Sequence, residues 1–144
     1  MLKSKIRPSL LLETDISKNV PEKPIHKPVR LSFEYIKAGK GFCLSHSDKN
    51  EIKEVMDCLR QLTVMSWYDV LGTGGKKGRK DGLAHTYYDD NLLCCVRRPE
   101  RVSRDIRISA VRASSKYRVF GFYFEHIYYL LWFDRNHKII PSGS

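Results

Sequence analysis

The sequence lacks several features that would identify large classes of protein. Its four cysteines form no CxxC pair, so their spacing predicts neither a zinc site nor a disulfide framework. No apolar run is long enough to cross a membrane, and Leu10–Leu12 is far too short for the core of a secretory signal. We therefore expect a cytoplasmic protein with reduced thiols, no bound metal and no association with membranes.

Motifs for nucleotide binding and ester hydrolysis are also missing. The glycine-rich segment Gly72–Gly82 contains Lys76, but no Ser or Thr follows it, so the GxxxxGK[ST] pattern is incomplete. The GxSxG motif of serine hydrolases does not occur. Asp89 and Asp90 lack the partner ligands that a magnesium site needs. These absences argue against a P-loop, against Ser-His-Asp catalysis and against a cofactor of any kind.

What the chain has in excess is positive charge. It contains 26 Lys and Arg against 16 Asp and Glu, a formal net charge of +10 over 144 residues. Residues 1–28 hold only six of these cations and three of the acids, so most of the excess lies in the remainder. A basic surface attracts phosphate backbones, acidic proteins and anionic membranes alike. RNA is the first partner to consider because the polar positions of Asp105–Ile140 are mainly Arg, Lys, His and Tyr, side chains that can grip and cleave a phosphodiester.

The distribution of residues predicts a flexible arm followed by one domain. Residues 1–28 contain four prolines scattered among charges and no apolar period, which is typical of a flexible segment. The chain as a whole is 42% hydrophobic and 11% aromatic, as in globular proteins. We assign a single domain to residues 29–141.

The first half of this domain predicts one strand and two helices. Val29–Ile36 alternates apolar and polar residues, as a strand does. Asp48 and Glu51 form a capping-box pattern, after which apolar residues recur at helical spacing to about Val64. Ser66 is a suitable N-cap for a second, short helix before the glycine-rich segment.

The last third predicts three strands joined by tight turns. Alternation marks strands around Ile106–Ala110 and Tyr117–Phe124, and Ile127–Phe133 is apolar on both faces. A strand that is apolar on both faces belongs in the interior of a sheet. We therefore expect an α+β fold, in which an antiparallel β-sheet of four to five strands has one long and one short helix packed on one face.

The basic strands also carry residues suited to cleaving RNA without a metal. Such cleavage needs an acceptor for the 2′-OH proton, cations that stabilise the phosphorane and an acid for the leaving oxygen. His137 follows the last strand among cations and can transfer protons near neutral pH. Arg112 and Arg118 flank a tight turn and could clamp one phosphate. Tyr117 or Tyr87 could stack an unpaired base.

Further contacts to RNA are expected from the glycine-rich basic loop, from a second wall of the site and from the C-terminal turn. In chain order these candidates are Lys76, Lys77, Arg79, Lys80, His85, Tyr87, Arg135 and Lys138. The linker before the last three strands is strongly basic as well, with four arginines within residues 97–104. Such cations contact the RNA backbone whatever its sequence.

The carboxy-terminal third resembles the RelE/ParE toxin superfamily. The similarity rests on Tyr117-Arg118-Val119, on the hydrophobic strand Tyr129–Phe133 and on the basic turn at His137, within a similar order of one strand, two helices and a β-meander. This resemblance implies a RelE-like fold and a bacterial toxin with a cognate antitoxin protein as partner. Many members are endoribonucleases that cut messenger RNA on the ribosome. The resemblance also supports the roles of the two arginines and the histidine.

Three functions therefore stay open. The first is an RNA-binding toxin that acts on mRNA as a metal-independent endoribonuclease. The second is a non-catalytic basic protein that occludes a partner, either a gyrase-poison relative of the same fold or a phage defence or counter-defence factor. The third is a structural RNA-binding protein. Growth arrest on expression would separate the first from the third.

Overall fold

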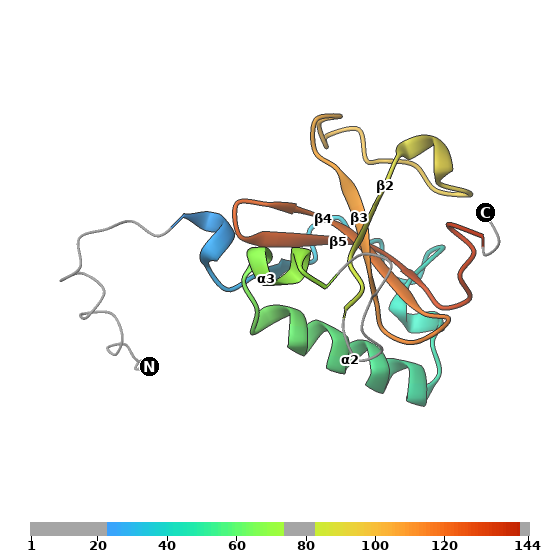
Figure 1. Cartoon of the computed structure of the whole chain (residues 1–144). Helices are drawn as coiled ribbons and strands as arrows, with labels where there is room; N and C mark the ends of the chain where they lie inside the picture. The colour runs from blue at the N-terminus through green and yellow to red at the C-terminus, as the bar shows by residue number, and fades with distance from the viewer. Residues whose placement is uncertain (1–22, 74–82, 142–144) are drawn as a thin grey trace, which may run out of the picture.

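The computed structural model describes residues 23–73 and 83–141, which form an α+β fold (Figure 1). The described strands are β1 (Arg30–Ser32), β2 (Thr86–Tyr88), β3 (Ile108–Arg112), β4 (Arg118–Phe124) and β5 (Ile127–Asp134). The helices are α2 (Lys49–Thr63) and α3 (Trp67–Leu71), and the 3₁₀ turns are η1 (Pro24–His26), η2 (Leu44–His46) and η3 (Asp90–Leu92). The prediction of one long and one short helix is confirmed.

Both helices begin at the residues whose side chains cap them. The Asp48 carboxylate accepts the Glu51 amide at 2.8 Å, and the Glu51 carboxylate accepts the Asp48 amide at 2.9 Å. This reciprocal pair satisfies two backbone donors that would otherwise lack a partner in the first turn. The Ser66 hydroxyl accepts the Asp69 amide at 3.2 Å and starts α3 in the same way.

The described strands form a mixed sheet in the order β1-β5-β4-β3-β2. β2 to β5 are antiparallel neighbours, but β1 runs parallel to β5. The expectation of a wholly antiparallel sheet is therefore wrong at this edge. Alternation of apolar and polar residues identifies a strand but not the strand with which it pairs. Hydrogen bonds from the start of β1 to other segments hold it in its direction. The Val29 amide donates to the carbonyl of Met65 at 2.9 Å, and the Arg30 amide donates to that of His126 at 2.8 Å.

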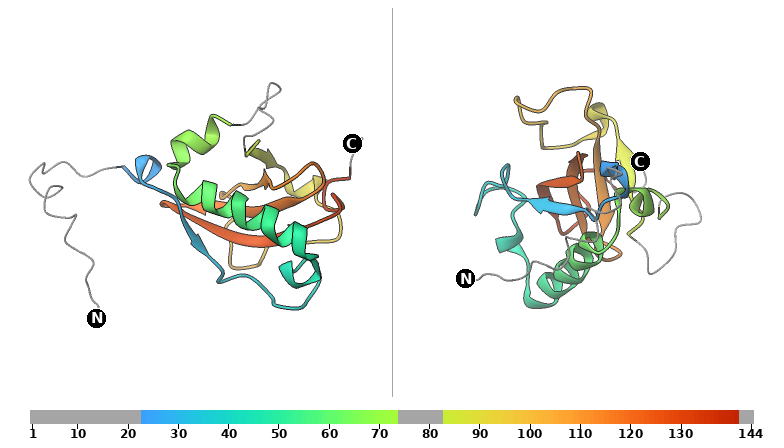
Figure 2. Two further views of the ribbon diagram at one scale, coloured as in Figure 1. Left: turned by 90° about the horizontal axis from the view of Figure 1, so that it is seen from below. Right: turned by 90° about the vertical axis from the view of Figure 1, so that its left-hand side faces the viewer.

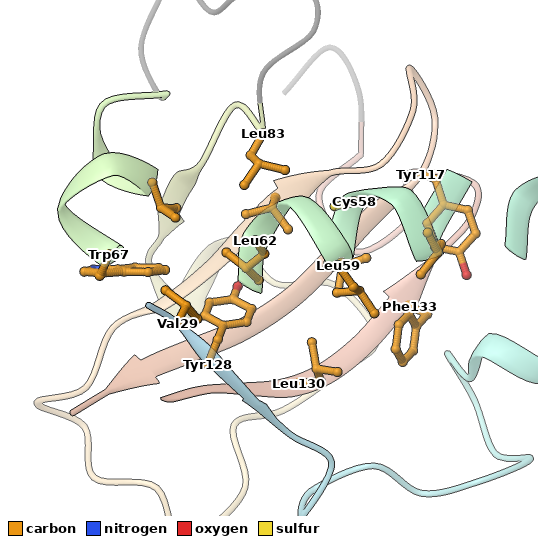
Figure 3. Close-up of a cluster of buried hydrophobic side chains, with 14 residues drawn as sticks. Val29, Cys58, Leu59, Leu62, Trp67, Leu83, Tyr117, Tyr128, Leu130 and Phe133 are labelled. Atoms are coloured by element: carbon orange, nitrogen blue, oxygen red, sulfur yellow. The ribbon is translucent and has the colours of Figure 1, made fainter. Parts of the chain in front are cut away.

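One face of the sheet packs against the helices (Figure 2, Figure 3). Leu62 of α2 and Trp67 of α3 meet Tyr128 and Leu130 of β5 in this cluster, and all four are buried. Each buried side chain of the size of Leu62 stabilises the fold by roughly 1.5–3 kcal/mol. The helices thus cover a single face, as expected.

Irregular segments cover the opposite face. Phe120, Phe122 and Leu131 of the strands pack there against Val102 and Ile139, which lie in the connections before β3 and after β5. β5 has β1 on one side and β4 on the other, with a hydrophobic cluster on each face. This double cover explains why Ile127–Phe133 is apolar throughout and confirms its predicted interior position.

The described structure extends to the N-terminal side of the predicted domain boundary. Ile25 in η1 packs against the helix-side cluster, and the ring of His26 lies 5.3 Å from that of Tyr68 in α3. Pro28 forms an isolated bridge with Ser66. Residues 23–28 of the expected arm therefore contact α3, and residues 1–22 lie outside the described part. Within the part that is described, no helix is long and apolar enough to cross a membrane.

Candidate nucleic-acid interface

The predicted phosphate-binding arginines lie side by side at one end of the sheet. Arg112 is the last residue of β3, Arg118 is the first of β4, and the two are register partners. Arg118 is also the register partner of Asp134, the last residue of β5, and His137 follows in the next turn. The antiparallel pairing of β3, β4 and β5 therefore gathers these predicted residues at one end of the sheet.

Arg118 is partly committed to holding the β3–β4 turn. Its Nη1 donates to the carbonyls of Ser114 at 2.8 Å, Ser115 at 3.2 Å and Tyr117 at 3.4 Å. Burial lowers the pKa of the Arg118 guanidinium, and the charge of Arg112 acts in the same direction. The side chain is half-buried, so its first role is structural and only part of it can meet a phosphate.

Tyr117 does not occupy a position from which it could stack a base. Its side chain is buried in the helix-side cluster, and its hydroxyl lies 2.6 Å from the Ser47 hydroxyl. Burial raises the pKa of the Tyr117 hydroxyl, which makes proton release harder. The reason is the strand period: Tyr117 shares the face of β4 that Val119 presents to the helices.

His137 is held in a defined turn after β5. Its backbone has a φ of 58°, and its Nδ1 lies 2.5 Å from the Ile140 carbonyl. The buried carboxylate of Asp134 fixes this turn by accepting the amides of Lys138 at 2.9 Å and Ile139 at 2.7 Å. Because a carbonyl oxygen only accepts, Nδ1 of the neutral ring carries the proton and Nε2 keeps a lone pair. The half-buried ring is thus prepared to accept a proton at Nε2.

The other two residues of the C-terminal turn differ in their exposure. Arg135 donates from Nε to the Glu51 carboxylate at 2.8 Å, and its Nη2 lies 3.9 Å from a carboxylate oxygen of Asp48. It therefore joins the end of β5 to the first turn of α2. Lys138 is exposed at the surface, where it can contact an anionic ligand.

His85 and Tyr87 are held in an aromatic cluster. His85 is only 5% exposed, and its ring meets those of Trp67 and Tyr87 edge-on at 4.8 and 4.6 Å. Burial lowers the pKa of His85 to about 4, with a smaller contribution from Arg107, so the ring is neutral at pH 7. The Arg107 guanidinium lies 4.0 Å from the Tyr87 ring centroid. The buried His85 ring therefore offers little surface to a ligand, and Arg107 already covers one face of Tyr87.

The predicted basic loop lies outside the described residues, and with it Lys76, Lys77, Arg79 and Lys80. In the basic linker, Arg98 has a structural role, since its Nε and Nη2 each donate to Asp90 at 2.8 Å. Its Nη1 donates to the carbonyls of Ser103 at 2.8 Å and Ile106 at 2.6 Å. This arginine holds the linker in shape, and the other arginines of the linker are exposed.

The structure contains a pocket of about 570 Å³ that the sequence did not predict. It lies between residues 34–42 and residues 95–101, on the sheet face opposite the helices. Its apolar lining includes the half-buried rings of Tyr35, Phe42 and Trp132. Aromatic rings in an open pocket offer stacking surfaces for a planar group.

Exposed cations surround these rings. Lys37 and Lys40 come from the segment after β1, whereas Arg97 and Arg101 come from the linker before β3. Arg101 lies 5.0 Å from the Tyr35 ring centroid and 3.5 Å from a Glu34 carboxylate oxygen, in an exposed pair that contributes little to stability. Glu34 and Glu100 offset part of the charge, but cations are in excess. In the sequence, only the clustered arginines of the linker pointed to this surface. The lysines and aromatic rings beside them could be identified only from the folded structure.

The chemistry that these two surfaces offer is proton transfer, phosphate binding and stacking. Among residues 23–73 and 83–141, no group of three or more His, Cys, Asp or Glu side chains could hold a metal ion. Comparison of the chain with family models, with curated proteins and with solved structures gave no match.

Proposed function

We propose that this protein binds single-stranded RNA. The observation that carries the proposal is the pocket in which Lys37, Lys40, Arg97 and Arg101 surround Tyr35 and Trp132. Unpaired bases stack on aromatic rings, while cations at the rim neutralise the phosphates on either side. The net charge of +10 supports the same partner, because it strengthens the attraction to any polyanion.

We further propose that the end of the sheet near His137 cleaves the bound RNA without a metal. Nε2 of His137 would take the 2′-OH proton, and Arg112 with the exposed part of Arg118 would stabilise the phosphorane. The register of β3, β4 and β5 supports this arrangement, since Arg118 has Arg112 as its partner on one side and Asp134, three residues before His137, on the other. In this form the protein is a RelE-like toxin that acts on mRNA in the cytoplasm and is neutralised by a cognate antitoxin.

A second candidate is binding without cleavage. Two observations favour it: Nη1 of Arg118 is occupied by backbone carbonyls, and Tyr117 is buried. A protein with these constraints can still occlude RNA or a protein partner through its basic surface. Where the partner is RNA, the two candidates share the binding step and differ in whether the bound RNA is then cleaved.

The binding proposal is tested by reversing charge at the pocket. Lys37→Glu combined with Lys40→Glu should weaken binding to a single-stranded RNA oligonucleotide by about tenfold or more at low salt. The slope of log Kd against log salt should fall by roughly 0.7 for each lost phosphate contact. Fluorescence anisotropy at several salt concentrations measures both quantities. The matched control is Lys49→Glu with Lys53→Glu on exposed positions of α2, which lies on the other face of the sheet. Equal losses in the two double variants would mean that only overall charge matters.

The cleavage proposal is tested at His137 with a chelator present. His137→Ala should slow cleavage of the same RNA by roughly 10²–10⁴ while leaving Kd unchanged. His46→Ala, at an exposed histidine in η2, is the control and should cut at the wild-type rate. Expression of the wild-type chain should arrest growth, and His137→Ala should relieve the arrest. RNA binding with no cleavage by the wild type would select the second candidate.

A further inference from the structure

Cys94 and Cys95 lie beside each other on the surface. Their Sγ atoms are 3.2 Å apart, and both side chains are exposed. Successive side chains of an extended chain point in opposite directions. Cys95 has a φ of 75°, in the left-handed region that non-glycine residues seldom adopt, and this turn in the backbone removes the usual alternation. The local conformation therefore holds two thiols in contact.

The pair is fixed to the rest of the fold. The Cys94 amide donates to the carbonyl of Ile139 at 2.8 Å, and the Ile139 amide donates to the buried Asp134 carboxylate. Cys95 also lines the 570 Å³ pocket. The dithiol thus stands where the turn after β5 meets the pocket.

The two thiols lie within hydrogen-bonding distance of each other. The hydrogen bond with Cys94 raises the pKa of Cys95, and the Cys94 charge adds to this effect. Because Cys95 gives up its proton less readily, we take Cys94 as the attacking sulfur. The other two cysteines, Cys43 and Cys58, are buried, and burial raises the pKa of Cys58 to about 12. Accessible thiol chemistry therefore belongs to the adjacent pair.

We propose that Cys94 and Cys95 form a vicinal dithiol site that reacts with low-molecular-weight disulfides and closes to a Cys94–Cys95 disulfide. The Cys94 thiolate attacks one sulfur of the small disulfide, forms a mixed disulfide and releases one thiolate. That thiolate takes the Cys95 proton, the Cys95 sulfur attacks Cys94 Sγ, and the second small thiol leaves. Two electrons and two protons pass from the cysteines to the small disulfide, which becomes two thiols.

The geometry makes this closure short and reversible. The sulfurs need to approach from 3.2 Å to a bond of about 2.05 Å. Consecutive Cα atoms are about 3.8 Å apart, closer than in most disulfides, so small thiols should reopen the ring readily. The site does not depend on the proposed function, because its chemistry involves no RNA.

The test uses the reduced full chain and oxidised glutathione. After incubation, remaining thiols are alkylated and the peptide that contains residues 94 and 95 is weighed. The wild-type peptide should be two hydrogens lighter and carry neither glutathione nor alkylating reagent. Dithiothreitol should restore both thiols. Alkylation of both cysteines, or a glutathione retained on each, would overturn the proposal.

Two variants identify the second step. Cys95→Ser removes the resolving sulfur, so one glutathione should remain on Cys94. Cys95→Gly removes the same sulfur and suits the left-handed backbone, so it serves if the serine variant does not fold. It should also retain one glutathione on Cys94. Cys58→Ser is the control, and its peptide at residues 94 and 95 should close as in the wild type. If Cys58→Ser did not form the Cys94–Cys95 disulfide, a cysteine outside the adjacent pair would take part in the reaction.

Discussion

Gly121 lies where the pairing of β4 with β5 shifts its register. A Cβ at this position would lie 2.4 Å from the Tyr129 carbonyl oxygen and 2.6 Å from Cε2 of Tyr128. The Tyr128 ring cannot move away easily, since it is completely buried and its hydroxyl lies 3.1 Å from both oxygens of Ser109. The close approach of β4 and β5 therefore depends on the absence of a side chain at Gly121.

We expect Gly121→Ala to lower the free energy of unfolding by about 3 kcal/mol, because it overpacks a rigid part of the core. Urea denaturation followed by tryptophan fluorescence measures the change. The control is Gly72→Ala, where the nearest neighbour of a Cβ is the Asp69 carbonyl oxygen at 3.3 Å, and its effect should be within about 1 kcal/mol. Equal stability of Gly121→Ala and wild type would contradict the close approach.

His85 should make stability depend on pH between about 4 and 6.5. Burial lowers its pKa in the folded protein to about 4, below the unperturbed value of 6.5. Between these values the unfolded chain binds a proton that the folded chain does not, so the free energy of unfolding rises with pH. Stability is thus complete above pH 6.5 and falls toward pH 4, by up to about 1.4 kcal/mol per pH unit. Urea melts at half-unit steps of pH measure this slope.

His85→Phe should remove this dependence. A phenyl ring keeps the contacts with Trp67 and Tyr87, and it removes a buried Nε2 that has no hydrogen-bond partner among the described residues. Stability at pH 7 should consequently change little or rise. His46→Asn, at an exposed position, should retain the wild-type slope. If His85→Phe also kept that slope, another group would be responsible for it.

At the scale of the elements, α2 depends on its first turn. Asp48→Ala removes the acceptor for the Glu51 amide and should lower the free energy of unfolding by about 1 kcal/mol. Thermal or urea unfolding measures the loss. Asp57→Ala provides a matched control, because Asp57 lies exposed in the middle of the same helix, and it should cost less than about 0.5 kcal/mol. An equal effect at both positions would show that charge, and not capping, sets the stability.

The elements that could be predicted from the sequence are those specified by local chemistry. The capping pair of Asp48 and Glu51 fixed the start of α2, and the tight turn after Arg112 made its pairing with Arg118 foreseeable. β2 was missed because three residues at a sheet edge are too few for a recognisable period. The strand alternation that places Tyr117 on the same face as Val119 already predicted that Tyr117 is buried. We instead assigned it to base stacking because its aromatic ring suits that role.

The pocket could not be predicted because its two walls come from distant parts of the chain. Lys37 and Lys40 precede α2, whereas Arg97 and Arg101 precede β3, and only the folded sheet brings them together. The parallel neighbour of β1 was hidden for the same reason. Composition indicated a basic surface but gave no indication of which cations share it.

For the molecule as a whole, the contacts of η1 set the expected result of truncation. The described helices and strands all begin after residue 22, so deletion of residues 1–22 should leave a cooperative unfolding transition at nearly the wild-type midpoint. Deletion of residues 1–28 should also leave a cooperative transition, but should lower stability by about 1–2 kcal/mol because the apolar contact of Ile25 is lost. Urea melts of the two truncated chains measure the difference. Identical midpoints would mean that η1 adds nothing to the fold.

Among the described strands, β1 comes first in the sequence and its neighbour β5 comes last. A growing polypeptide leaves the ribosome from its N-terminus, so Arg30–Ser32 stays unpaired until Ile127–Tyr129 has emerged. α2 must wait as well, because its apolar face is completed by Tyr128, Leu130 and Phe133 of β5. Contacts between distant segments form slowly, since closing a long loop costs entropy. A nascent chain that ends before β5 lacks the strand that joins β1 to β4 and that completes the helix-side core, so complete folding is expected only after β5 has been made.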